Sequence, residues 1–222
     1  MFKWLRGTGD GLAGVEERFG GMLSDGRHVF DLAMAARLGG ADPESIKDTL
    51  HETEERTDEA EREIRRRVIV HASVHGAGDL SACLMYMSIA KDAERIADLS
   101  KNLFELAQAV GPPPAGELRD DLIATRDKVS PMIVEAARIF ADDDREAAQD
   151  FIERARVVQQ HCMGWIVRLV RERVDVPQPA ASALTYRHMA RIAANLLNII
   201  SAVVMPLDQL DYPDWDEGDR TD

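Results

Sequence analysis

The chain has 222 residues, a formal net charge of −13 and an apolar fraction of 45%. Such an acidic surface repels nucleic acid and anionic lipid, so nucleic acid is excluded as an expected partner. Cys83 and Cys162 form no CxxC pair, which indicates a reducing compartment. No apolar run approaches the ~18 residues that span a bilayer. We therefore expect a cytoplasmic protein without stable membrane insertion, at most peripheral to the inner face of the membrane.

Long segments rich in Ala, Leu, Arg and Glu alternate with short Gly- and Pro-rich breaks, which predicts an all-α fold. The first expected helix covers about residues 15–38 and ends at Gly39-Gly40. The second begins with Asp42-Pro43, a helix N-cap followed by proline, and continues to about residue 72. The third covers about residues 79–110, where Gly111-Pro-Pro-Pro114 stops it.

Three further helices are expected at about residues 115–141, 145–174 and 180–210. Pro131 should kink the first of them, and the aspartates at 142–144 should cap the second. We predict two tandem three-helix bundles, residues 15–110 and 115–210. Two tails flank the bundles: an N-terminal tail (1–14) and an acidic tail (211–222) that is expected to be disordered. Phe2 and Trp4 in the first tail have no assigned role.

The third and sixth expected helices are related in sequence. The segment 91–104 aligns without gaps on 187–200, and an arginine and an asparagine recur at equivalent places. The acids do not recur, because Ala190 and Ala194 stand where the first copy has Glu94 and Asp98. The halves are therefore predicted to be a pseudo-twofold duplication whose second copy has lost its acids.

Four carboxylates stand out on the second and third expected helices. Glu54 and Asp58 are four residues apart, as are Glu94 and Asp98, so each pair lies on one helix face. With a hairpin turn centred near Gly76, Glu54 comes level with Asp98, and Asp58 with Glu94. Oxygen-rich clusters that bridge helices suit iron and manganese, whereas the ordinary alternative is a set of surface ion pairs.

These motifs resemble those of the PhoU family. Glu94-Arg-Ile-Ala-Asp98, followed by Asn102, resembles the repeated ERIxD signature of the family. Glu54-Glu-Arg-Thr-Asp58, followed by Glu61-Arg-Glu-Ile64, resembles the partner motif on the preceding helix. The resemblance covers nearly the whole chain in length and helix layout, with specific motifs in the first half and eroded ones in the second.

The resemblance implies two three-helix bundles, a homo-oligomeric (dimeric) state and no enzymatic activity. It implies a regulator of phosphate transport and phosphate-responsive signalling, whose partners are the ATPase component of a phosphate transporter and a sensor histidine kinase. It also implies an iron, zinc or manganese cluster. The ligands carried over by position are Glu54, Asp58, Glu94 and Asp98.

The second half departs from the family pattern, because the four equivalent positions hold Arg156, Gln160, Ala190 and Ala194. The sequence therefore confines the expected metal site to the first bundle.

Three alternatives stay open at this point. The chain could be a metal-binding protein for iron or manganese handling, a scaffold whose acids are only ion-paired, or a di-metal enzyme. Against the enzyme, no EExxH-like pair supplies the histidine ligands usual in di-iron bundles. His71 and His75 have a metal-ligand spacing, but Gly76 and Gly78 follow, so a polar hairpin end is the preferred interpretation.

Overall fold

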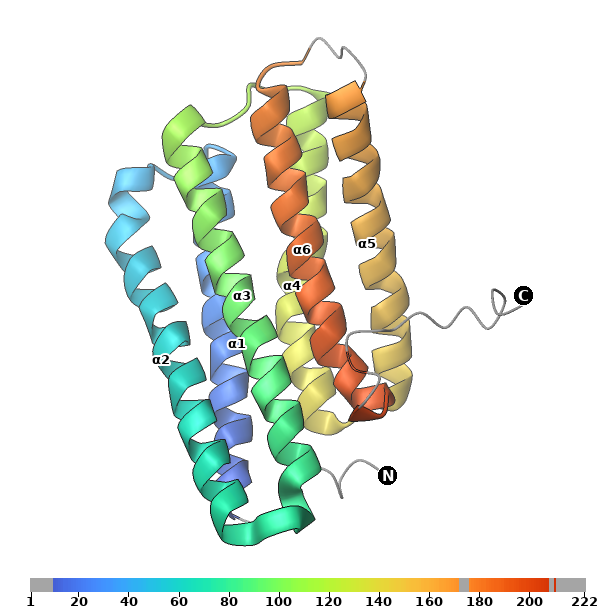
Figure 1. Cartoon of the computed structure of the whole chain (residues 1–222). Coiled ribbons are helices and arrows are strands. Elements are labelled where there is room, and N and C mark those ends of the chain that lie inside the picture. Colours follow the sequence, from blue (N-terminus) through green and yellow to red (C-terminus); the bar gives the residue numbers. More distant parts are fainter. Residues whose placement is uncertain (1–9, 172–175, 208–209, 211–222) are drawn as a thin grey trace, which may run out of the picture.

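The computed structural model describes residues 10–171, 176–207 and 210, and these residues are helical without a β-strand. The elements are α1 (Asp10–Arg37), α2 (Pro43–His75), the 3-10 helix η2 (Gly76–Asp79), α3 (Leu80–Val110), α4 (Glu117–Asp142), α5 (Arg145–Arg171) and α6 (Pro179–Val204). The helices lie side by side in two groups of three (Figure 1). The all-α prediction is confirmed.

The two groups are joined along their length. α1, α2 and α3 pack on one another, as do α4, α5 and α6, while α1 contacts α4 and α3 contacts α6. Phe19 of α1 and Phe140 of α4 meet with ring centroids 5.1 Å apart, and the Asn198 amide of α6 donates to Asp92 of α3 over 3.3 Å. Buried side chains from all six helices form one continuous core, so the two bundles do not have separate interiors.

Several helix ends differ from the sequence expectation. α1 begins at Asp10 rather than near residue 15, and α2 continues to His75 rather than ending near residue 72. α6 ends at Val204 rather than near 210, because Pro206 holds the preceding Met205 in an extended conformation. The expected tail segments at 1–9 and 211–222 lie outside the described residues.

Two local predictions concern α4 and α5. Asp144 caps α5 as expected, because its carboxylate accepts a hydrogen bond from the Ala147 backbone N–H at 3.0 Å. Pro131 lies inside α4, and the helix continues on both sides of it.

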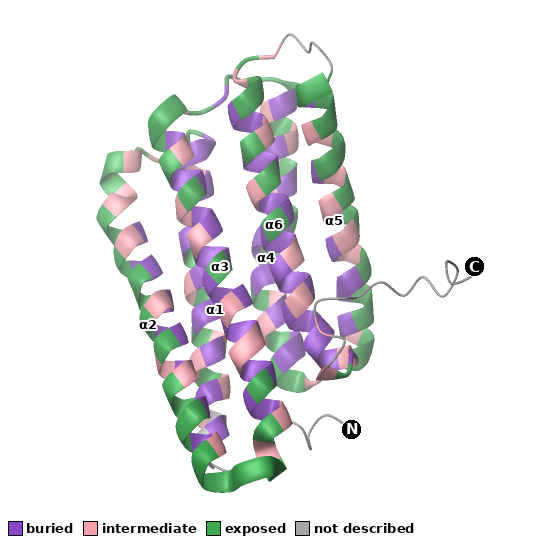
Figure 2. Cartoon of the chain, in the orientation of Figure 1, coloured by how far each residue is buried: buried purple, intermediate pink, exposed green. Residues whose placement is uncertain are grey.

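The α2–η2–α3 hairpin is the most exposed part of the fold. It extends beyond the ends of α4 and α6 at the end of the molecule where α1 begins (Figure 1), and its tip is coloured as exposed in Figure 2. The helical stretch Pro43–Val110 contains an 18-residue window of mean hydropathy 1.2, of which only 28% is buried. By length and composition that window could cross a membrane, but the chain reverses direction at η2.

A buried arginine joins three helix ends at the opposite end of the molecule. The Arg37 side chain is fully buried. Its Nε donates to the Thr185 hydroxyl of α6 at 3.1 Å, and one Nη donates to the Gly111 carbonyl that ends α3 at 2.8 Å. Burial lowers the pKa of Arg37, and the carbonyl ends of α1 and α3 supply the compensating negative potential.

We expect Arg37→Ala to lower the free energy of unfolding by about 2–4 kcal/mol, because it leaves the buried Gly111 and Thr185 groups without their charged donor. Chemical denaturation of the purified chain measures this loss. Arg138→Ala, on the exposed face of α4, is the matched control and should change stability by about 0.5 kcal/mol or less. Equal losses in the two variants would show that Arg37 does not hold the halves together.

Candidate metal centre

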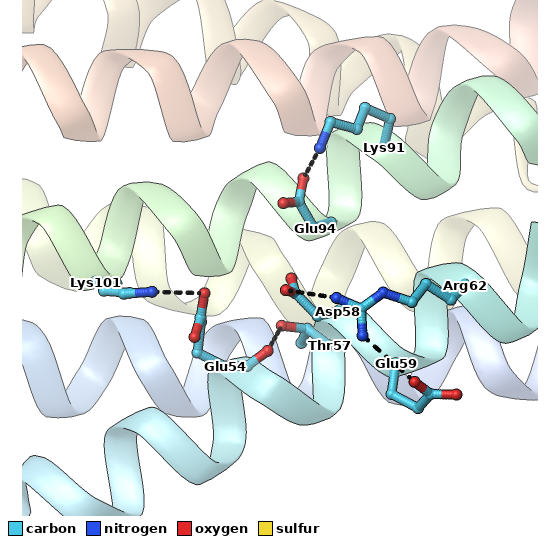
Figure 3. A network of polar contacts seen from close by, with 8 residues as sticks. All are labelled: Glu54, Thr57, Asp58, Glu59, Arg62, Lys91, Glu94 and Lys101. Atoms are coloured by element: carbon cyan, nitrogen blue, oxygen red, sulfur yellow. Dashed lines mark hydrogen bonds and ion pairs between the residues drawn. The ribbon is translucent and has the colours of Figure 1, made fainter.

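Three of the four predicted carboxylates come together between α2 and α3. Glu54, Asp58 and Asp98 each offer a carboxylate oxygen, and these oxygens lie within 4.8 Å of one another. Figure 3 shows Glu54 and Asp58 on α2, with their carboxylates directed toward α3. Glu54 is buried, whereas the other two are partly exposed. No other such group of His, Cys, Asp or Glu occurs among the residues that the structure describes.

Glu94 does not join this group, although it lies near it. Figure 3 shows Glu94 opposite Asp58 across the hairpin, as expected from the sequence, with its carboxylate directed to Lys91 and away from Asp58. The Glu94 carboxylate accepts a hydrogen bond from Lys91 and adjoins the Asp98 carboxylate on the same helix. The direction of the side chain, and not its height along α3, therefore separates Glu94 from the other three acids.

Three of the four carboxylates also have a basic partner. Glu54 pairs with Lys101 at 3.1 Å, Asp58 approaches Arg62 at 3.5 Å, and Glu94 accepts a 2.5 Å hydrogen bond from Lys91. Figure 3 shows these contacts as dashed lines. The long Asp58–Arg62 contact is exposed on the arginine side and contributes little, whereas the Glu54 contact holds a buried acid. A cation at this site has to compete with Lys101.

Glu94 is the most electrostatically perturbed carboxyl in this region. Burial raises its pKa to about 7, the adjoining Asp98 carboxylate acts in the same direction, and Lys91 acts against them. Near neutral pH the Glu94 side chain is therefore partly protonated, and it lies next to the Asp98 carboxylate.

The oxygens of Glu54, Asp58 and Asp98 form a donor set that fits a hard cation. Metal–oxygen distances of about 2.1–2.5 Å place opposite ligands about 4–5 Å apart, and the observed spread of 4.8 Å is of that size. Carboxylate oxygens suit Mg²⁺, Ca²⁺, Mn²⁺ and Fe²⁺, whereas Zn²⁺ prefers nitrogen and sulfur ligands. The group contains no His or Cys, so the chemistry of the site favours manganese or iron over zinc.

The equivalent positions in the second bundle have no acid. Arg156 and Gln160 lie on α5, and Ala190 and Ala194 lie on α6. Arg156 lines a hollow of about 530 Å³ together with Gln149, Glu153 and two apolar residues. The second bundle therefore has the same pairing of helices but lacks the carboxylates at these four positions.

The second bundle contains a polar cluster that the sequence did not indicate. One oxygen of Asp121 (α4) accepts hydrogen bonds from the Tyr186 hydroxyl (α6) at 2.6 Å and from His161 Nε2 (α5) at 2.9 Å. Burial alone would raise the pKa of Asp121, but these hydrogen bonds outweigh it and lower the pKa. The three residues lie far apart in sequence on different helices, so only the packed structure brings them together.

His71 and His75 lie at the end of α2, where the chain enters the hairpin turn. Their rings stack with centroids 4.0 Å apart, and His71 Nε2 makes a 2.9 Å hydrogen bond to Asp79 of η2. These contacts extend α2 to the start of η2.

The shifted pKa of Glu94 makes the stability of the chain depend on pH in a defined direction. Between the ordinary value of 4.5 and about 7, the native chain binds more protons at Glu94 than the unfolded chain does. The Glu94 contribution therefore lowers the free energy of unfolding as pH rises through this window. Glu94→Gln cannot titrate, so its stability should rise relative to wild type between pH 5 and pH 8.

Denaturation midpoints of wild type and Glu94→Gln across this range measure the difference. Glu105→Gln, an exposed position on the same helix, controls for the removal of one carboxylate. Parallel pH profiles for wild type and Glu94→Gln would contradict the raised pKa.

Comparisons with known proteins identify the fold and a family domain in the first half of the chain. Residues 21–107 match a family model described as PhoU domain. A similar solved structure is that of the phosphate transport system regulatory protein PhoU from Streptococcus pneumoniae, at a TM-score of 0.70 and 15% identity over 86% of this chain and 94% of that chain. The comparison with curated proteins gives no match. The chain thus contains a PhoU domain, at residues 21–107, within a structure that has the all-helical PhoU fold.

Proposed function

We propose that this chain is a non-enzymatic, cytoplasmic regulator of phosphate transport and phosphate-responsive signalling. It would act through contacts of its helical surface with the ATPase component of a phosphate transporter and with a sensor histidine kinase. The observation that carries the proposal is the PhoU domain at residues 21–107. That domain contains the whole α2–α3 carboxylate group, and the fold match to a phosphate transport regulator extends over most of the chain.

We further propose that the first bundle binds a hard divalent cation through Glu54, Asp58 and Asp98, with Glu94 beside Asp98. A bound cation supplies positive charge where three carboxylates meet. In a chain of net charge −13, this would reduce the repulsion between the α2–α3 face and an acidic partner surface. The homo-oligomeric state expected from the sequence stays a prediction.

One other function has a specific observation in its favour. This alternative is a purely structural scaffold. Glu54, Asp58 and Glu94 each have a basic neighbour, so in a scaffold these acids would only form ion pairs. A metal-handling protein would use the same three ligands but would affect metal and not phosphate physiology. A di-metal enzyme is disfavoured, because the three-carboxylate group lacks the histidines of such centres.

Cation binding distinguishes the metal centre from the scaffold. We expect the wild-type chain to bind Mn²⁺ in a titration calorimeter. Asp58→Asn combined with Asp98→Asn should weaken that binding by about tenfold or more, because two of three donors are lost. Asp120→Asn combined with Asp142→Asn removes the same charge from exposed positions of α4 and should leave the binding unchanged.

Lys101→Met gives an independent test of the same site. Removing the ammonium that pairs with Glu54 should strengthen Mn²⁺ binding if a cation competes for that carboxylate. In an ion-paired scaffold, the same substitution would only destabilise the fold, because it leaves a buried acid without its partner. No Mn²⁺ or Fe²⁺ binding by the wild-type chain would remove the metal centre from the proposal.

The regulatory role is tested in cells. Deleting the gene should change the expression of phosphate-starvation genes, because the coupling between transporter and kinase is lost, and the wild-type chain should restore it. A transcriptional reporter of those genes at high and low phosphate measures the effect. Unchanged expression would overturn the phosphate proposal, and an altered response to iron or manganese instead would favour the metal-handling alternative.

A further inference from the structure

The tip of the α2–η2–α3 hairpin exposes a group of aliphatic side chains that no other part of the described structure covers. On α2, Ile69, Val70 and Val74 are 58%, 63% and 73% exposed. On α3, Leu80 and Leu84 are 47% and 49% exposed. We call these five residues the hairpin patch. Large exposed apolar groups on one end of a soluble protein mark an interaction surface.

The hairpin tip is less acidic than the rest of the molecule. Residues 64–90 contain three arginines (65–67), two histidines and a single acid, Asp79. The Asp79 carboxylate forms a hydrogen bond of 2.9 Å with His71 Nε2. The three arginines pair with Glu61, Glu59 and Glu63, so a chain of net charge −13 has one end that is apolar and close to neutral. The general repulsion from anionic lipid expected from composition is weakest at this end.

The basic and apolar side chains meet in one shallow hollow. Arg66, Arg67, Val70, Val74 and the two histidines line a space of about 420 Å³ on α2. Arg66 and Arg67 are ion-paired with Glu59 and Glu63, which lie farther from the tip. Exposed pairs of this kind are weak, so both guanidinium groups are able to exchange these carboxylates for phosphate oxygens nearer to the tip.

We propose that the hairpin patch docks on the surface of an anionic phospholipid bilayer. Val70 and Val74 would enter the boundary between headgroups and acyl chains, and Arg66 and Arg67 would contact lipid phosphates. Apolar side chains beside a basic band are the two components of interfacial membrane binding. The proposal is independent of phosphate regulation and of the cation site.

The projecting shape of the tip favours a bilayer over a second copy of this chain. A stable protein interface buries about 800 Å² on each partner, whereas the hairpin patch is a narrow end formed by two helices and their turn (Figures 1 and 2). A deformable lipid surface can surround such an end. The arginines at the rim add the charge complementarity that anionic headgroups provide.

Vesicle flotation of the full chain tests the proposal. We expect binding to vesicles of phosphatidylcholine mixed with phosphatidylglycerol, weaker binding to phosphatidylcholine alone, and loss of binding at high salt. Val70→Ser combined with Val74→Ser should lower the bound fraction at least about fivefold, because two aliphatic anchors are removed. Arg66→Gln combined with Arg67→Gln should lower it on the mixed vesicles only.

Matched controls are available on α5. Val157 and Val170 are 57% and 72% exposed, so Val157→Ser combined with Val170→Ser makes the same chemical change away from the hairpin and should bind as wild type does. All four valine and arginine positions are at the surface, and circular dichroism verifies that each variant keeps its helices.

Three results would overturn the proposal. The first is vesicle binding that the hairpin substitutions leave unchanged, including the case in which Phe2→Ser with Trp4→Ser abolishes it instead. The second is equal binding to neutral and anionic vesicles. The third is a smaller sedimenting species for the Val70→Ser, Val74→Ser variant, which would assign the hairpin patch to contact between copies.

Discussion

The register between α2 and α3 is the constraint on which the rest of the functional surface depends. η2 sets it, because this short 3-10 helix moves the reversal of the chain beyond Gly76. The register brings Glu54, Asp58 and Asp98 together, and it places Glu94 opposite Asp58 with its carboxylate directed to Lys91 (Figure 3). A different turn length would separate the three carboxylates while leaving each helix intact.

The sequence predicted the helices well because their signals are local. A stop signal such as Gly111-Pro-Pro-Pro114, a cap such as Asp144 and the apolar period can each be recognised within a few residues. In the structure α3 ends at Val110 and Asp144 caps α5. The turn was harder, because Ala77-Gly78-Asp79 looks like a loop but keeps helical hydrogen bonding. Three of the four candidate ligands come together, because a spacing of four residues places each acidic pair on one helix face.

Contacts between distant segments could not be predicted in this way. Lys101 as the partner of Glu54, Arg37 as the link to Thr185, and the Asp121 cluster each join helices through positions that no short motif connects. Their geometry depends on crossing angles and side-chain packing. The local pattern specified which residues are polar, and the packed fold determined which of them are paired.

The two halves differ in how far their polar groups are neutralised. In the first bundle the polar groups at the α2–α3 junction are carboxylates that outnumber their basic partners. One of them, Glu94, has a pKa raised to about 7. In the second bundle the polar groups are mutually satisfied: Arg154 forms ion pairs with both Glu135 and Asp150, and Asp121 accepts from Tyr186 and His161. An excess of like charge costs stability, because closely spaced carboxylates raise one another's pKa.

The carboxylate group and the hairpin patch are on the same hairpin, but electrostatics does not couple them. Asp58 and Val74 are separated by about 24 Å along α2, at 1.5 Å of rise per residue. The Debye length at physiological ionic strength is about 8 Å, so the charge of a bound cation is largely screened before it reaches the tip. Any coupling between the two sites has to pass through the packing of α2 against α3.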